Sequence, residues 1–90
     1  MRFTFDPEKG QALKRSRGRD LEEIQEIFFG RHYEDQRSDD PDQWRAIGWS
    51  KGQLFVVIYE EREDDQGTIY HLVTLWPATT KEEKLYAQHN

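Results

Sequence analysis

WRAIGWSKGQLFVVIYEER, residues 44–62, contains the only long apolar run of the chain and predicts a β-hairpin. Residues 54–59 are six consecutive apolar residues, most of them β-branched or aromatic, which matches the length of a strand rather than of a helix. Because the run does not alternate with polar residues, both of its faces are predicted to be buried in the middle of a sheet. Gly52 precedes the run and can supply the positive φ of a tight turn. The rest of the chain is expected to extend this hairpin or to pack on it.

Length and composition narrow the class of protein. A chain of 90 residues is expected to form one domain, residues 1–90, which buries only roughly 60 to 65% of its unfolded surface. The absence of cysteine excludes disulfides, cysteine nucleophiles and thiolate metal sites. No stretch suits a signal peptide or a membrane span, so a cytoplasmic location is expected. The formal net charge of −5, from 18 acidic and 13 basic residues, argues against a protein that coats nucleic acid.

The N-terminal segment predicts a strand and a helix. Residues 2–5 alternate and indicate a short strand, and Asp6-Pro7 is typical of a helix start. The helix is expected to run to about Arg17 and to stop at Gly18. Its end carries a basic cluster, which suits either the helix dipole or an RNA phosphate. The cluster consists of Lys14, Arg15, Arg17 and Arg19.

The next segment predicts a second helix and then a polar loop. Asp20 and Glu23 form a capping box, and the helix after it has an apolar stripe and ends at Gly30. Residues 31–43 are polar, with a strand start at 32–33 and a turn at 38–42. The aspartates of this turn lack the spacing of a calcium loop and are interpreted as solvated. The stripe consists of Leu21, Ile24, Ile27 and Phe28.

The C-terminal third predicts another strand and a short helix. Alternation over residues 68–76 places Ile69, His71, Val73 and Leu75 on one face, and Pro77 ends the strand. Either Thr79 with Glu82 or Thr80 with Glu83 can cap the helix that follows. The predicted fold class is α+β: a small antiparallel sheet of about four to five strands, with two N-terminal helices on one face and a short C-terminal helix.

Five stretches, taken in order, resemble a known family. They are Phe5-Asp6-Pro7-x-Lys9; Gly18 followed by Leu21-Glu22-Glu23; Ile47-Gly48-x-Ser50-x-Gly52-x-Leu54-x-Val56-Val57; Tyr59-x-x-Arg62; and Ala78-Thr79-x-x-Glu82-x-x-x-Tyr86. Together they are similar to the BrnT toxins, small RelE-like ribonucleases of type II toxin–antitoxin systems. The resemblance covers nearly the whole chain. It implies a RelE-like fold and a cytoplasmic bacterial toxin that cleaves RNA without a metal or another cofactor. It also implies inhibition by a BrnA-like antitoxin with a DNA-binding domain, in a toxin–antitoxin heterotetramer. The unpaired edge strands of so small a sheet favour a homodimer as well.

The chain departs from this family where charge matters most. The family has Lys-His-Gly where this chain has Ser16-Arg17-Gly18, and Arg-Ile-Ile-Ser-Ala-Arg where it has HLVTLW at residues 71–76. Both arginines of that strand are therefore missing, and His71 and Trp76 stand in their places. Arg62 keeps the basic residue of the family, and Lys14, Arg15 or Arg17 lies within a helical turn of the missing lysine.

Metal-free RNA cleavage needs a base for the 2′-hydroxyl, an acid for the leaving oxygen and cations on the phosphate. His71 titrates near neutral pH, so the predicted catalytic residues are Arg62 and His71. Lys14, Arg15 and Arg17 are the predicted RNA-binding residues. The alternative for His71 is a packed, hydrogen-bonded core histidine. No metal site is expected, because His32 and His89 have no close ligand partners in the sequence.

Tryptophans can stack on bases, but they more often close a core or lie in a partner interface. Trp49 and Trp76, near strand ends, are the predicted interface residues. Two hypotheses remain open from the sequence. The first is a ribonuclease toxin, and the second is a catalytically impaired domain of the same fold that binds an antitoxin-like partner or itself.

Overall fold

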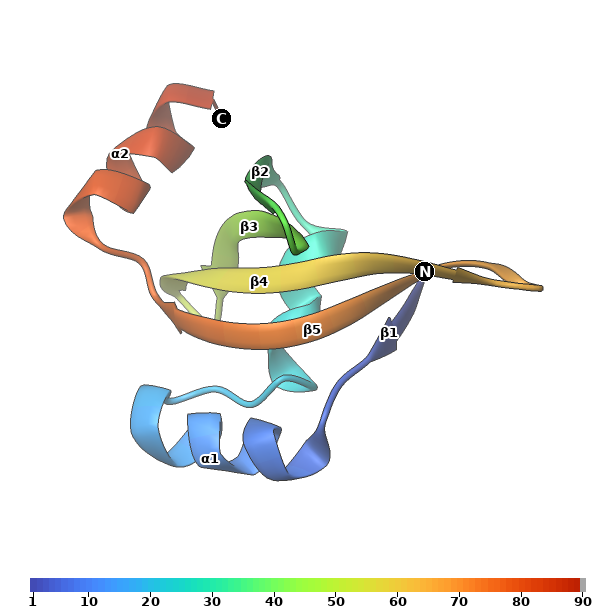
Figure 1. Ribbon diagram of the computed structural model, residues 1–90. Coiled ribbons are helices and arrows are strands. Elements are labelled where there is room, and N and C mark those ends of the chain that lie inside the picture. The colour runs from blue at the N-terminus through green and yellow to red at the C-terminus, as the bar shows by residue number, and fades with distance from the viewer. Residues whose placement is uncertain (90) are drawn as a thin grey trace.

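The computed structural model describes residues 1–89 and shows a small α+β fold with a five-stranded mixed sheet and three helices (Figure 1). In chain order the elements are β1 (Arg2–Thr4), α1 (Pro7–Arg17), the 3₁₀ helix η1 (Glu23–Phe29), β2 (His32–Asp39), β3 (Asp42–Ser50), β4 (Gln53–Asp64), β5 (Gly67–Pro77) and α2 (Thr80–His89). The predicted α+β class is confirmed. None of the described helices is long and apolar enough to cross a membrane.

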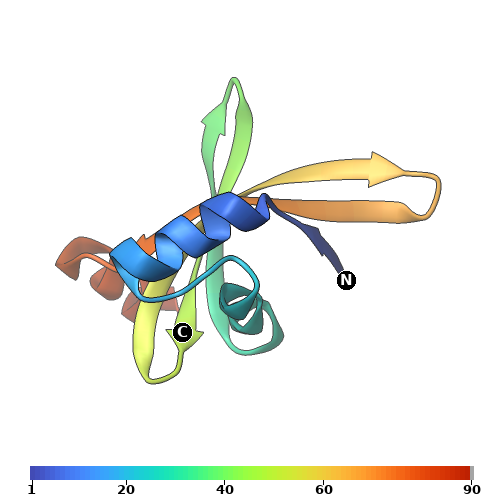
Figure 2. The same ribbon diagram turned by 90° about the horizontal axis from the view of Figure 1, so that it is seen from below.

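The sheet is mixed, which corrects the prediction of an antiparallel sheet. Its strand order is β1-β5-β4-β3-β2. The four strands from β2 to β5 pair antiparallel with their neighbours, whereas β1 pairs parallel with β5. The helical segment after β1 carries the chain to the opposite edge, where β2 starts. Figure 2 shows the β2–β3 and β4–β5 hairpins projecting from the body in different directions.

The central hairpin forms as predicted. Strands β3 and β4 are in register from Trp44 opposite Tyr59 to Ser50 opposite Gln53. Lys51 and Gly52 form the turn with φ of 49° and 82°, the left-handed pair that matches the twist of a two-residue hairpin. All six residues of the 54–59 run are buried, so β4 is covered on both faces.

Two apolar clusters cover the two faces of the sheet. The first combines α1 and η1 with one side of the strands, and the second combines α2 with the other side (Figure 1). The first contains Leu13, Leu21, Ile24, Ile27, Phe28, Ala46, Phe55, Val57, Tyr59, Leu72 and Leu75. The second contains Ile47, Leu54, Val56 and Ile58, with Tyr33, Val73, Trp76, Ala78, Leu85 and Tyr86 packed on it.

The helix ends follow their sequence signals. The Asp6 side chain accepts a hydrogen bond from the Glu8 amide at 3.0 Å, and α1 ends at Gly18 with φ of 92°. In the first capping box, the Glu23 amide donates to Asp20 at 2.7 Å. Of the two possible boxes before α2, the structure contains the one in which the Glu82 amide donates to Thr79 Oγ1 at 3.2 Å.

The second helix is a 3₁₀ helix and lies close against β3. Its buried residues Ile24 and Ile27 are spaced by three, the period at which side chains align in a 3₁₀ helix, and buried Leu21, just before the helix, continues the same spacing. Gly48 of β3 allows this approach, because a Cβ atom at that position would lie 2.9 Å from Cβ of Ile27. The position of η1 therefore depends on a residue without a side chain.

Two expectations about the strands were wrong. Strand β2 begins at His32, as expected, but it continues to Asp39 through polar residues that were expected to form a loop, because an edge strand pairs through its backbone and needs no apolar alternation. In β5, Ile58 pairs with Thr74 and Tyr59 with Leu72, so Val73 is an extra residue in a bulge. The bulge places Leu75 in the first cluster and Val73 in the second, so the predicted face of 69, 71, 73 and 75 is not formed.

Candidate active site

His71 lies on β5, where the short strand β1 joins the sheet. Thr4 of β1 is directly opposite His71, and its Oγ1 lies 2.8 Å from His71 Nδ1. Arg2 holds β1 in place through Asp64, with Nη1 2.8 Å from Oδ2. Nδ1 is thus engaged, while Nε2 of His71 has no hydrogen-bond partner within residues 1–89. The histidine is half-buried at the surface of the sheet rather than packed in the core.

Arg62 and Glu60 of β4 share the face of His71. Glu60 is directly opposite His71, and Arg62 is two residues further along the same strand. Arg62 Nη2 forms an ion pair with Glu60 Oε1 at 2.9 Å, with 54% of the Arg62 side chain exposed. Hydrogen bonds from Arg62 and from Gln43 lower the pKa of Glu60. The carboxylate therefore stays ionised and offsets much of the charge on Arg62.

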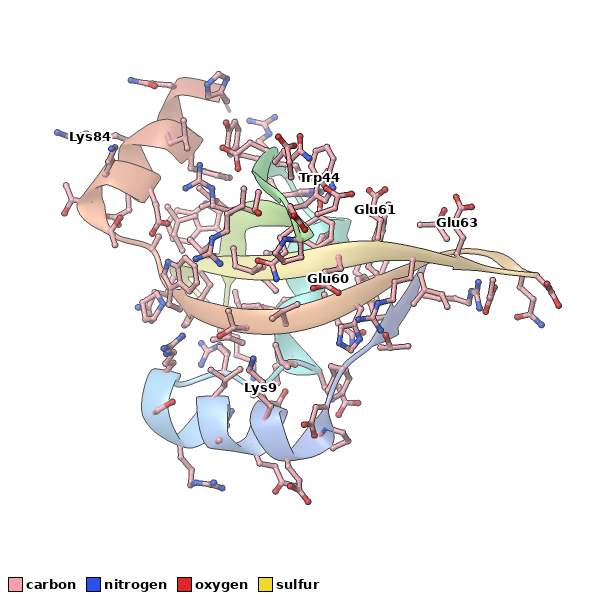
Figure 3. All side chains as sticks on the ribbon, in the orientation of Figure 1. Lys9, Trp44, Glu60, Glu61, Glu63 and Lys84 are labelled. Carbon is pink, nitrogen blue, oxygen red and sulfur yellow. The ribbon has the colours of Figure 1, made fainter. Side chains whose placement is uncertain are left out.

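Burial and neighbouring cations keep His71 neutral. Burial lowers the pKa of His71 most, followed by the charge of Arg62, with a smaller contribution from Lys9, while Glu60 acts in the opposite direction. Lys9 extends from α1 toward β5 (Figure 3). In the neutral tautomer whose Nδ1–H donates to Thr4, Nε2 is open and is a suitable proton acceptor, and cations beside it suit a phosphate.

The structure brings Arg62 and His71 together but places the basic helix end elsewhere. Lys14 Nζ forms an ion pair with Glu23 at 2.6 Å. Arg17 donates to the carbonyl oxygen of Leu75 at 2.6 Å. Leu75 is four residues from His71, or roughly 13 Å along the strand. Arg15 is exposed and forms no side-chain hydrogen bond or ion pair with any residue from 1 to 89.

Three residues near His71 were not among the predicted site residues. Thr4 lies between two phenylalanines of one face, so its side chain must point to the other face, toward His71. Glu60 precedes Arg62 by two positions in a strand, a spacing at which opposite charges pair. Lys9 belongs to the first family-like stretch, but only the packing of α1 against β5 places it near His71.

The two predicted interface tryptophans differ in exposure. Trp49 is 52% exposed and lies 6.4 Å from the ring of Tyr86 between centroids. Trp76 is partly buried: its Nε1 donates to Glu82 Oε1 at 3.0 Å, and the Arg37 guanidinium lies 5.4 Å above its ring. Trp49 is therefore available to a partner, whereas Trp76 is held by contacts within the chain.

No family model matches the chain, and no curated protein is significantly similar to it. Within the described residues, no group of three or more histidine or carboxylate side chains is arranged to hold a metal ion.

Proposed function

We propose that this protein is the toxin of a type II toxin–antitoxin pair, a metal-independent ribonuclease with a BrnT-like, RelE-like fold. The observation that supports this function best is the neutral, half-buried His71, with Nδ1 held by Thr4 and with Arg62 beside it. The five family-like stretches of the sequence support it as well. In this proposal the toxin acts on cytoplasmic RNA and is inhibited by a BrnA-like antitoxin.

The proposed reaction uses groups on three elements. His71 Nε2 accepts the proton of the 2′-hydroxyl, which then attacks the adjacent phosphorus. The charges of Arg62 and Lys9 stabilise the negative charge that develops on the phosphate oxygens. The leaving 5′-oxygen must gain a proton, which the Lys9 ammonium can donate. Glu60 holds Arg62 in position and must release part of its charge to the substrate.

Induced expression followed by analysis of total RNA tests this proposal. The wild-type chain is compared with His71→Ala and Arg62→Ala, and with Arg31→Ala as a control that removes an exposed cation outside the site. Growth arrest and RNA cleavage are expected for the wild type and the control, and a loss of at least about 100-fold for His71→Ala. Intact RNA with a folded wild-type protein would refute the ribonuclease.

A binding module of the same fold is the second candidate. It is favoured because Arg62 and Lys14 are each paired with a glutamate, which weakens their attraction for phosphate, and because Trp49 is 52% exposed. In this case His71→Ala and Arg62→Ala have no effect, and Trp49→Ala reduces association. Sedimentation of the purified chain, alone and with a co-expressed neighbouring gene product, measures that association.

A further inference from the structure

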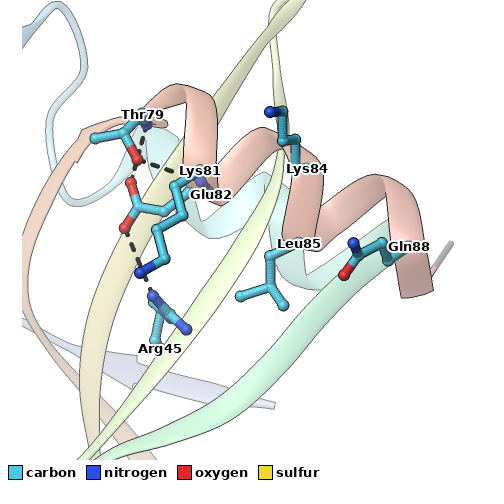
Figure 4. A pocket seen from close by; sticks show the side chains of 7 residues that line it. All are labelled: Arg45, Thr79, Lys81, Glu82, Lys84, Leu85 and Gln88. Carbon is cyan, nitrogen blue, oxygen red and sulfur yellow. Dashed lines mark hydrogen bonds and ion pairs between the residues drawn. The ribbon is translucent and has the colours of Figure 1, made fainter.

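A pocket of about 490 Å³ lies between α2 and the sheet, on the face opposite α1 (Figure 4). Arg45 of β3 lines one side. The other side is lined by Thr79 and by the α2 residues Lys81, Glu82, Lys84, Leu85 and Gln88. The volume falls in the range of small-molecule sites. His71 and Arg62 do not line the pocket, so this inference is independent of the proposed ribonuclease.

Arg45 presents one nitrogen of its guanidinium to the pocket. Its Nε and Nη2 donate to the two oxygens of Asp35 at 2.8 and 2.5 Å. Nη1 lies 3.7 Å from Glu82 Oε2, a distance too long for a hydrogen bond. Within residues 1–89, Nη1 donates no hydrogen bond. The hydrogen bonds with Asp35 also raise the pKa of Arg45. Arg45 is thus rigidly held and charged, and Nη1 faces Glu82 in an ion pair without a hydrogen bond.

Lys81 adds a second cation beside Arg45. Its side chain extends toward the guanidinium in Figure 4, and within residues 1–89 its ammonium has no ion pair or hydrogen bond. The carboxylate of Glu82 forms an ion pair with Arg45 at 3.7 Å and also accepts hydrogen bonds from Trp76 Nε1 at 3.0 Å and from the Thr79 amide at 2.9 Å. Glu82 is the one carboxylate among the residues that line the pocket, whereas Arg45, Lys81 and Lys84 are cations, so the lining carries a net positive charge that a bound anion would offset.

We propose that this pocket binds a phosphate monoester of nucleotide size. The phosphate lies between Arg45 Nη1 and Lys81 Nζ, where several oxygens can accept from separate donors. Phosphate fits this pair better than a single carboxylate, because its greater charge and its oxygens in three directions match a fixed guanidinium and a mobile ammonium. Leu85 and the amide of Gln88 then contact the organic part of the ligand. The phosphate can belong to a free nucleotide or to an RNA strand.

Nuclear magnetic resonance of the tryptophan indoles can detect this binding. The indole N–H of Trp76 donates to Glu82, which lines the pocket, so its signal should move when the pocket is occupied. The signals of Trp44 and Trp49 serve as internal references. The ¹⁵N-labelled protein is titrated with inorganic phosphate, with a nucleoside 5′-monophosphate and with a short RNA, and a saturable shift of Trp76 is expected.

Two lysines of α2 make a matched pair of variants. Lys81→Ala should weaken nucleotide binding by about tenfold or more, because it removes a direct contact with the phosphate. Lys84 also lines the pocket, but its side chain points away from Arg45 in Figure 4, so Lys84→Ala should weaken binding less than Lys81→Ala does, by less than about twofold. Both positions are exposed, and far-ultraviolet circular dichroism verifies that both variants are folded.

The outcomes separate the sources of phosphate and can overturn the proposal. Tighter binding of the nucleotide than of RNA supports a free nucleotide as ligand, and the reverse supports a phosphate of a strand. No saturable shift with any of the three probes up to about 10 mM would refute the site. Equal weakening by Lys81→Ala and Lys84→Ala would refute it too, because it would indicate diffuse attraction. Binding that survives in His71→Ala separates the pocket from the proposed active site.

Discussion

Replacing Gly48 by alanine is expected to destabilise the fold, because β3 passes directly beneath η1 at this residue. A Cβ atom at Gly48 would lie 2.9 Å from Cβ of Ile27 and 3.2 Å from Cβ of His32. Carbon atoms in contact normally lie about 3.5 to 4.0 Å apart, so η1 would have to move by at least roughly 0.6 Å. Ile27 is only 1% exposed and cannot turn toward solvent.

The expected magnitude follows from two opposing effects. Overpacking of a buried contact costs about 1 to 3 kcal/mol, whereas loss of glycine's freedom in the unfolded chain stabilises by about 0.4 to 1 kcal/mol. The net decrease in the free energy of unfolding is therefore about 1 to 2 kcal/mol. For a domain of this size, each 1 kcal/mol lowers Tm by roughly 4 to 8 °C.

Urea unfolding of Gly48→Ala beside Gly30→Ala measures this effect. Gly30 has a negative φ of −112° and nothing within 4 Å of an added Cβ, so its replacement should change stability by less than about 0.5 kcal/mol. An unchanged or increased stability of Gly48→Ala would show that η1 does not lie against β3 as described. An equal decrease in the free energy of unfolding in both variants would show that the loss of a glycine, rather than the contact with Ile27, causes the destabilisation.

Two further predictions concern titrating groups. Two lysines and the Asp20 amide lower the pKa of Glu23 to about 2 from 4.5, so ionised Glu23 stabilises the fold above pH 4.5 and this contribution is lost as the pH falls toward 2. Because the lysine partners are exposed, Glu23→Gln should lower the free energy of unfolding in urea by about 1 kcal/mol at pH 7 and by almost nothing near pH 2. A decrease that does not depend on pH would contradict this reasoning. Arg62→Gln should raise the pKa of His71, because it removes a cation and leaves Glu60 without its ion pair. An NMR titration of the His71 ring protons measures this pKa. A pKa that falls or does not change would refute the proximity of Arg62 and His71.

Much of the local structure was predictable because its causes lie within a few residues. The capping boxes at Asp20 and Thr79, the cap at Asp6 and the turn at Gly52 each depend on side chains or φ angles of adjacent residues. The unbroken apolar run 54–59 likewise predicted a strand covered on both faces. Strand β2 was predicted only at its start, residues 32–33, because the backbone of β3, rather than its own pattern, holds the rest of it in the sheet.

The candidate site was predictable only in part. The residue types of Arg62 and His71 indicated their possible chemistry, and the structure places them together. The sequence could not show that Thr4 holds Nδ1 or that Arg17 binds the carbonyl of Leu75 instead of joining the site. Each of these contacts joins residues of different elements that are far apart in the chain, whereas Glu60 and Arg62 lie two residues apart on β4.

The sequence by itself determined the elements that arise from local hydrogen bonding and from the spacing of apolar residues. Only the tertiary structure decided which faces those elements share. The parallel pairing of β1 with β5 and the bulge at Val73 set the neighbours of His71, and the packing of α2 over β3 created the pocket at Arg45. The physical reason is that the backbone of almost any residue can pair in a sheet. The partner and the register of each strand therefore follow from the burial of the whole core rather than from any single stretch of sequence.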